Sequence, residues 1–445
     1  MIQRLFALKQ NETTISREIL AGLTTFLTMS YIIFVQPAVL SIDFAGNPTG
    51  LSFSAVLLAT CLVSAFSCVL MGILTNYPIA LAPGMGENFF FISVIMSLTA
   101  LGFAQAWQTA LGIVFIAGVL FLIISLFRVR EMILNAISPS MRNGIAVGIG
   151  LFITFIGLQH GKIIVARPGT MIGINPEVVS VDVGVFLFGL LATAILRARH
   201  MKGDILWGIL AASLLSFSLG KIQFQGIVGM PVLENTAMMK MDIAGALNLV
   251  CLPFIVVFLF MDMFDTLGTL MGAAEAGGLM KNNKLPKARQ AFVVDAVGTV
   301  AGACMGTSTV TSYIESTTGI FFGGRTGLTS VTVGILFLLS LLFSPIIGII
   351  GQYPPITAPA LVIVGCMMIR NVRFINWDDF SEGLPSFLII VGIPFCYSIA
   401  DGLALGFISY PVIKFFCGKG KKVSWLMYVL AVILLLYFIF IRSRL

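Results

Sequence analysis

Long apolar runs recur along the whole of this 445-residue chain, and they limit its possible folds more than any other feature. Each run is about 20 residues long, the length of an α-helix that crosses a bilayer. Hydrophobic residues make up 58% of the chain and charged residues only 10%, whereas soluble domains are about 25% charged. A transmembrane β-barrel would alternate apolar and polar residues in segments of about ten. The sequence therefore predicts an all-α polytopic membrane protein.

The apolar runs indicate about fourteen transmembrane spans and one extra run near the C-terminus. The spans are expected at 19–40, 53–74, 80–101, 108–127, 134–158, 183–197, 205–220, 244–271, 288–305, 308–322, 327–350, 356–369, 384–399 and 402–416. The extra run, 424–441, is either a fifteenth span or a segment lying at the membrane interface. Fourteen spans divide into two sets of seven, and an odd number per set inserts the second copy upside down, as in many secondary transporters.

Lys and Arg gather in alternate loops, as the positive-inside rule requires if the N-terminus is cytoplasmic. The cytoplasmic loops then hold Arg128, Arg130, Arg197, Arg199, Lys202, Lys281, Lys284, Lys287, Arg289, Arg325, Arg370 and Arg373. The opposite loops at 42–52, 102–107 and 351–355 have no Lys or Arg, and the exception is the loop with Lys162 and Arg167. If the last two spans are divided at Asp401-Gly402, the final basic loop, with Lys419, Lys421 and Lys422, is also cytoplasmic. We expect a multi-pass protein of the cytoplasmic (inner) membrane.

Carboxylates occur inside three otherwise apolar or hydroxyl-rich stretches. Asp262 and Asp265 lie three residues apart in 258–272, so they share one helix face. Glu315 lies in the tenth span, and Glu87 in the third, where Pro and Gly interrupt the helix. An ionised side chain at membrane depth costs about 2.5 to 3.5 kcal/mol and usually marks function. Interrupted spans in corresponding positions of two halves indicate a binding site, so we expect these stretches to meet at one mid-membrane site.

The candidate residues differ in the chemistry they offer. Glu315, flanked by Tyr313, can accept two hydrogen bonds from a planar ligand with N–H donors. Asp265 can accept from the ligand or carry a proton, because a dry cavity favours the protonated carboxyl. Asp262 is either its relay partner or a hydrogen-bond brace. Asn88 can donate to and accept from the edge of a heterocycle.

Other residues near these stretches have competing interpretations. Phe89 either stacks on an aromatic ligand or packs in the core, and Glu87 either faces the site or points away from it. Asp295 and Asp401 are expected to brace helix ends. Thr25 can line the pocket, although small residues in the first span also allow close helix packing.

Several motifs of other function classes are missing from the sequence. No phosphate-binding GxxxxGK[ST] loop, HExxH or GxSxG occurs, so neither ATP-driven transport nor enzyme activity is expected. The seven Cys form no CxxC pair and the chain has only two His, so we expect no metal site and no cofactor. The net charge of +7 is explained by the cytoplasmic loops, and no nucleic-acid partner is expected.

Four short runs occur in order along the chain: EILAGLTTFLTMSY at 18–31, APGMGENF at 82–89, FDTLGT at 264–269 and YIES at 313–316. Together they resemble the nucleobase-cation symporters, also called nucleobase-ascorbate transporters, and within them the azaguanine/hypoxanthine-type purine permeases. The resemblance implies proton-coupled import of a purine base (adenine, guanine or hypoxanthine) by a homodimer with an elevator-like movement. The purine and the proton would be co-substrates, and membrane lipid would surround the protein.

The resemblance also implies a fold of seven-plus-seven inverted repeats with broken third and tenth spans. A core domain would comprise 1–129 and 241–350 (spans 1–4 and 8–11). A gate domain would comprise 130–240 and 351–445 (spans 5–7 and 12–14, with the extra C-terminal run). Glu87 departs from the family pattern, which often has an apolar residue there, and the run 424–441 has no place in the fourteen-helix scheme.

By the same resemblance, the substrate-binding and proton-coupling residues can be placed on this sequence. Asp265 and Glu315 match the acidic positions of the eighth and tenth spans, and Asn88 and Phe89 match the substrate-facing pair of the third span. Asp262 matches a second acidic position. The expected substrate-binding set is Asn88, Phe89, Asp265, Glu315, Thr25 and Tyr313, and the expected proton-coupling set is Asp262, Asp265 and Glu315.

Three rival functions are compatible with a membrane protein of this kind. A sulfate or dicarboxylate carrier is disfavoured because the three stretches offer carboxylates and no Lys or Arg for an anion. An intramembrane hydrolase could use paired Asp residues. A purely structural membrane protein would tolerate replacement of its buried carboxylates by Asn or Gln.

Overall fold

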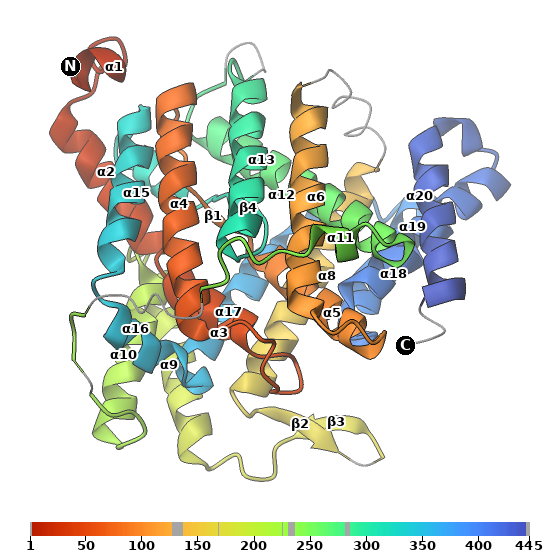
Figure 1. Ribbon diagram of the computed structural model, residues 1–445, viewed down its shortest axis with the longest axis horizontal. Coiled ribbons are helices and arrows are strands. Elements are labelled where there is room, and N and C mark those ends of the chain that lie inside the picture. The colour runs from red at the N-terminus through yellow and green to blue at the C-terminus, as the bar shows by residue number, and fades with distance from the viewer. Residues whose placement is uncertain are drawn as a thin grey trace.

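The computed structural model describes residues 2–126, 137–167, 169–224, 226–229, 236–280 and 285–441, and helices dominate it (Figure 1). The first half contains α1 (Ile2–Leu5), α2 (Ile15–Met29), α3 (Ile32–Ser41), α4 (Phe53–Thr75), β1 (Leu81–Pro83), α5 (Met85–Ala100), α6 (Ala106–Leu126), α8 (Pro139–His160), β2 (Ile164–Arg167), β3 (Met171–Ile174), α9 (Val181–Ala198) and α10 (Asp204–Ser218). The second half contains α11 (Ile243–Ala246), η1 (Leu249–Cys251), α12 (Leu252–Ala276), α13 (Ala288–Met305), β4 (Val310–Ser312), α14 (Ser316–Phe321), α15 (Gly327–Ser340), α16 (Ser344–Gly351), α17 (Pro354–Met368), η2 (Ile369–Phe374), α18 (Phe380–Phe395), α19 (Ile399–Phe416), η3 (Gly420–Lys422), α20 (Trp425–Leu436) and the π-helical turn η4 (Tyr437–Ile441).

Eight helical segments of the described chain are long and apolar enough to cross a membrane. They are Ile15–Ser41, Phe53–Thr75, Ala106–Leu126, Pro139–His160, Val181–Ala198, Leu249–Glu275, Pro354–Phe374 and Ile399–Phe416. Shorter apolar helices are Met85–Ala100, Asp204–Ser218, Gly327–Ser340, Phe380–Phe395 and Trp425–Ile439. The chain is therefore a helical polytopic membrane protein.

Several expected spans are divided in the structure. The expected spans 80–101 and 308–322 each consist of a short strand followed by a helix, β1 with α5 and β4 with α14. The expected span 327–350 is divided into α15 and α16, and Pro345 lies in the first turn of α16. A Pro is tolerated at that position because the first N–H groups of a helix have no internal partner.

The break between the last two spans lies at residues 396–398 and not at Asp401-Gly402, as the loop charges had suggested. The Ser398 hydroxyl oxygen accepts from the backbone N–H of Asp401 (3.2 Å), which makes Ser398 the N-cap of α19. Tyr397 just before it has a φ of 55°. The cap places Asp401 inside the first turn of α19. Of the basic loop residues, Arg128, Arg130, Lys281 and Lys284 lie outside the described residues, as does the expected boundary at 129–130.

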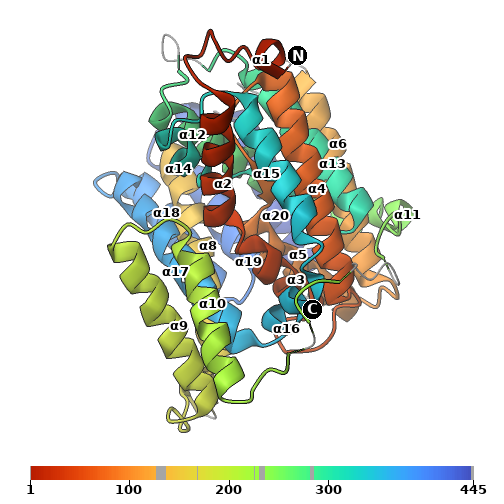
Figure 2. The same cartoon turned by 90° about the vertical axis from the view of Figure 1, so that its left-hand side faces the viewer.

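Glycines allow pairs of helices to approach closely, which is the usual packing device where lipid removes the hydrophobic drive for association. A Cβ on Gly327 of α15 would lie 2.0 Å from the carbonyl oxygen of Gly72 in α4. A Cβ on Gly365 of α17 would lie 2.3 Å from the carbonyl oxygen of Gly150 in α8. Figures 1 and 2 show α2, α15 and α4 side by side, and α9 beside α10.

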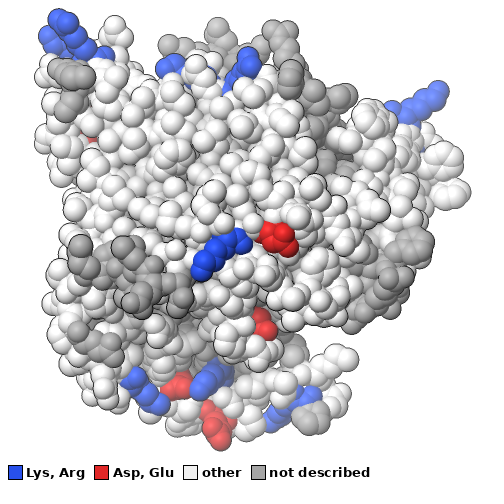
Figure 3. All heavy atoms as spheres, in the orientation of Figure 1, with Lys and Arg blue, Asp and Glu red and all other residues white. Residues whose placement is uncertain are grey.

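Charged side chains lie mainly toward the two ends of the face seen in Figure 3, with one group near its centre. Lys162, which departs from the positive-inside pattern, has its Nζ 2.5 Å from Oδ2 of Asp182, and Lys221 Nζ lies 3.1 Å from Oδ1 of the same carboxylate. The Tyr353 hydroxyl also donates to Asp182 (2.6 Å). The ion pair with Asp182 therefore offsets the charge of Lys162 within the fold.

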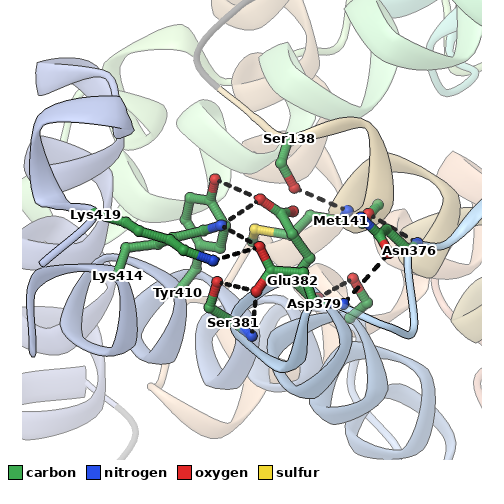
Figure 4. A network of polar contacts seen from close by, with 11 residues as sticks. Ser138, Met141, Asn376, Asp379, Ser381, Glu382, Tyr410, Lys414 and Lys419 are labelled. Carbon is green, nitrogen blue, oxygen red and sulfur yellow. Dashed lines mark hydrogen bonds and ion pairs between the residues drawn. The ribbon is translucent and has the colours of Figure 1, made fainter. Parts of the chain in front are cut away.

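A second charge network joins α18 to α19 (Figure 4). The Lys414 side chain is only 5% exposed, and its Nζ lies 2.7 Å from Oε1 of Glu382 and 3.6 Å from Oδ2 of Asp379. The Tyr410 hydroxyl donates to Glu382 (3.2 Å), and the more exposed Lys419 contacts Asp379 at 2.8 Å. Lys414 is therefore a buried cation whose charge is balanced by neighbouring carboxylates.

The extra C-terminal run forms α20 and η4, which pack on the rest of the protein. Met427, Leu430, Leu434 and Tyr437 are buried and form one stripe at helical spacing. The Tyr437 hydroxyl donates to Asp401 of α19 (3.1 Å), and its ring centroid lies 5.8 Å from that of Phe254 in α12. The opposite side of α20 is apolar and exposed, as expected for a helix facing lipid.

Candidate functional site

Strands β1 and β4 bring the two interrupted segments together. They pair antiparallel, with Leu81 opposite Ser312 and Pro83 opposite Val310. The Tyr313 hydroxyl donates to the Pro83 carbonyl oxygen (2.6 Å), and the Ser316 hydroxyl accepts from the backbone N–H of Ala80 (3.0 Å). Helices α5 and α14 begin directly after this pair. Helix N-termini present unpaired N–H groups and a partial positive charge, so the start of α5 offers donors here. The first N–H groups of α14 instead donate to the carbonyl oxygens of residues 313–315.

A cavity of about 720 Å³ lies beside this strand pair. Its wall is formed by the end of β4, the first turn of α5, and parts of α8, α12, α17, η2, α19 and α20. The volume is within the range of small-molecule sites. Arg370, Arg373 and Phe374 line one end of the cavity and are exposed, so the cavity reaches the surface there.

Three carboxylates line this cavity: Glu87, Asp265 and Glu315. The Tyr31 hydroxyl donates to Oε1 of Glu315 (3.2 Å). Oε2 of Glu87 is buried and has no hydrogen-bond partner within the described chain. None of the three forms an ion pair with Lys, Arg or His among the residues that the structure describes. The carboxylates of the cavity wall therefore lack a basic partner within the described residues.

Hydroxyl groups fill the cavity wall between the acids. Thr269 and Ser312 have their Oγ atoms 2.7 Å apart, and both residues line the cavity. Tyr313, one of the expected site residues, lies beside them on the same wall. Such hydroxyls can donate or accept, so they can adjust to either edge of a polar ligand.

Asp262 and Asp295 lie behind the cavity wall and are almost fully buried. The Thr299 hydroxyl donates to Oδ2 of Asp262 (2.8 Å), and the Thr266 hydroxyl donates to Oδ2 of Asp295 (2.6 Å). Thr266 is also 3.0 Å from Thr311, which lines the cavity. A chain of hydroxyls thus connects the cavity to Asp295.

Asn88, Phe89 and Thr25 do not line the cavity in this conformation. The Asn88 and Gln36 side-chain amides hydrogen-bond each other, and the Gln36 Nε2 also donates to Thr307 (2.9 Å). The Phe89 ring stacks on Phe44 at a centroid distance of 6.4 Å. Thr25 is buried against α14.

Sequence reasoning missed two cavity residues of clear chemical character. Tyr31 ends the 18–31 run, and a single Tyr in an apolar span carries no signal that separates a cavity hydroxyl from a packed ring. Arg142 lies in the first turn of α8 and inside the expected span 134–158, so the rule that an ionisable residue at membrane depth marks function could have identified it. It lines the cavity, as do Arg370 and Arg373. The expectation that the site stretches lack Lys and Arg is right for those stretches, but other helices supply three Arg side chains.

Comparison with known proteins identifies the family. Residues 16–405 match the model of a family described as the permease family. The chain belongs to this family. The permease is 40% identical over 445 residues to adenine permease AdeP of Escherichia coli, covering 100% of this chain and 97% of AdeP. It is 41% identical to guanine/hypoxanthine permease PbuG of Bacillus subtilis, covering 97% of this chain and 98% of PbuG.

The fold of this permease is also similar to solved structures of distant sequence. The transmembrane domain of the bicarbonate transporter BicA from a cyanobacterium superimposes with a TM-score of 0.60 at 16% identity, covering 88% of this chain and 96% of that domain. Similarity at this identity concerns the fold alone. As a permease, the protein is a transporter and not an enzyme.

Proposed function

We propose that this permease is a secondary active transporter that imports purine nucleobases, coupled to protons, across the cytoplasmic membrane. The observation that carries the proposal is the meeting of Asp265 and Glu315, from separate parts of the chain, at one cavity of about 720 Å³. A purine presents N–H donors that carboxylates accept, and ring acceptors to which hydroxyls and the first N–H groups of α5 can donate. The purine specificities in the names AdeP and PbuG support the same cargo.

Proton coupling is proposed for Asp262, Asp265 and Glu315. They form no ion pair with a basic side chain in the described regions, and an isolated charge at this depth is costly. A proton that neutralises such a carboxyl in one state and leaves it in another couples proton movement to cargo movement. We assign Asn88 and Phe89 to the substrate-binding set because they follow Glu87, a cavity-lining residue, in the sequence, although their side chains do not reach the cavity in this conformation. We assign Thr25 because its buried hydroxyl has no partner within the described chain.

The proposed transport cycle uses fourteen spans in two inverted sets of seven, in a homodimer with cytoplasmic N-termini. A core domain (1–129 and 241–350) would move as an elevator against a gate domain (130–240 and 351–445). The pairing of β1 with β4, one from each expected set, supports the repeat. The cavity is lined by α12 and β4 from one proposed domain and by α8, α17 and α19 from the other, which is where an elevator would carry its cargo.

An anion is the less favoured cargo because the similar proteins AdeP and PbuG are named as purine permeases, and because the three Arg side chains of the cavity are matched by three carboxylates, so that the lining has no excess of Arg. The likeness to the bicarbonate transporter BicA extends to the fold only. A purine-transport-deficient bacterial strain expressing this permease tests both cargoes. Uptake of labelled adenine, guanine and hypoxanthine should be measured with and without a protonophore, and with excess sulfate or bicarbonate as competitor.

We expect purine uptake that the protonophore abolishes and that the anions leave unchanged. Glu315→Gln should abolish it, whereas Glu275→Gln, a change of an exposed carboxylate on α12, should not. Absence of uptake of every base despite protein in the membrane would refute purine transport. Uptake that survives the protonophore would refute proton coupling alone.

A further inference from the structure

Arg142 lines the same cavity as the three carboxylates. It lies in the first turn of α8, and its guanidinium carbon is 5.6 Å from the centre of the Phe264 ring in α12. Phe264 immediately precedes Asp265, and both line the cavity with Arg142. The Phe264 ring stacks in turn on Phe260 at 6.0 Å. An Arg over an aromatic face is attracted by the electron density of the ring, so this contact holds the guanidinium against α12 on the cavity wall.

The hydrogen-bonding capacity of Arg142 is not satisfied by the protein. Its Nε is buried and has no hydrogen-bond partner, and Arg142 forms no ion pair, within the regions that the structure describes. Arg has five N–H donors and stays charged. Arg370 and Arg373 at the open end of the cavity are exposed, so water can serve them. Arg142 is the lining Arg whose buried donor needs an acceptor from a ligand.

We propose that Arg142 determines specificity by donating to the O6/N7 edge of a 6-oxopurine, so that guanine and hypoxanthine are the preferred cargo. This inference rests on the proposed purine transport. The forked donors of Arg match the adjacent O6 and N7 acceptors of guanine, whereas adenine presents an amino donor at the same edge. The N1–H of a 6-oxopurine remains for a cavity carboxylate, Asp265 or Glu315. One ring thus satisfies both the unpaired acid and the unpaired base of the cavity.

The test compares ligands and variants by competition binding to the purified, full-length permease with labelled hypoxanthine. For the wild type we expect hypoxanthine and guanine to bind about tenfold or more tightly than adenine and than 7-deazahypoxanthine, which lacks the N7 acceptor. Arg142→Gln should weaken hypoxanthine by about tenfold or more, and 7-deazahypoxanthine, which keeps only the O6 acceptor, by a clearly smaller factor. Arg142→Lys, which keeps one charged donor, should restore part of the difference. Arg199→Gln, a change of an exposed Arg that does not line the cavity, is the matched control and should change neither.

Two results would overturn the inference while leaving purine transport intact: a wild type that prefers adenine, or an Arg142→Gln variant that weakens hypoxanthine and 7-deazahypoxanthine by the same factor. The second would show that Arg142 supports the fold of the cavity without reading the base. If Arg142→Gln does not yield folded protein, the ligand series on the wild type and on Arg142→Lys decides the matter. Failure of the wild type to bind any purine would instead count against the proposed function.

Discussion

The buried Lys414 provides a quantitative test of how charges are held in this fold. Lys414→Met keeps a long apolar side chain but removes the cation from between Glu382 and Asp379. Breaking a buried pair from one side costs about 3 to 5 kcal/mol, because the remaining charge stays without a partner. The Glu382 side chain is 16% exposed and keeps the hydrogen bond from Tyr410. We therefore expect a loss of about 3 kcal/mol in the free energy of unfolding, at the lower end of that range.

The assay is equilibrium unfolding in mixed micelles with increasing SDS, followed by tryptophan fluorescence. The matched control is Lys419→Met, which removes a cation from the same Asp379 at a site where the Lys side chain is 41% exposed. Exposed pairs contribute little, so the control should shift the transition much less than Lys414→Met. A double change, Lys414→Met with Glu382→Gln, should be less damaging than Lys414→Met alone because no unpaired charge remains.

Equal shifts for Lys414→Met and Lys419→Met would refute the assignment of a buried charge at Lys414. The control also carries a pH dependence. Hydrogen bonds lower the pKa of Asp379 below its ordinary value: the bond from Lys419 has the largest effect, and the bond from Ser381 the next largest. A lowered carboxyl pKa stabilises the fold above the ordinary Asp pKa of about 4 and loses that contribution as the pH falls. The difference between wild type and Lys419→Met should therefore be larger at pH 7 than at pH 3.

Two further changes test the site and the helix packing. Tyr31→Phe removes the hydroxyl that donates to Glu315; we expect about tenfold weaker purine binding by the purified protein, and an unchanged dissociation constant would show that this hydrogen bond is not used. Gly327→Ala would place a Cβ 2.0 Å from the Gly72 carbonyl oxygen, so we expect a large loss of monodisperse protein in fluorescence-detected size-exclusion chromatography. Gly184→Ala, with no neighbouring heavy atom within 4 Å of the added Cβ, should behave as wild type; similar yields for both would contradict the packing argument.

The part of the site that sequence reasoning could locate follows from one strong energetic rule. An ionisable group at membrane depth is expensive, so Asp265 and Glu315 were expected to face a shared polar space, and both line the cavity. Pro83 and Gly84 similarly marked the place where the third span begins as an extended strand. These signals are local, since a single residue type in an apolar context carries the information.

The remaining features depend on contacts between distant residues, which local patterns do not contain. Asn88 looked like a ligand contact by its chemistry, but in this conformation its amide is paired with Gln36, which lies in another helix. The cavity role of Arg142 depends on where α8 lies against Phe264 of α12. The break between α18 and α19 lies near Tyr397 and not at Asp401-Gly402, because Ser398 caps α19. This difference of a few residues is one that hydropathy does not resolve.

The position of α20 affects how chimeras with related permeases should be made. The region that matches the family model stops at residue 405, within α19, but Leu430 and Leu434 of α20 still contribute to the cavity wall. A chimera joined at residue 405 would combine the cavity of one parent with α20 of the other. A change in its selectivity could then come from either part, so an exchange meant to transfer the whole cavity should include the chain through residue 441.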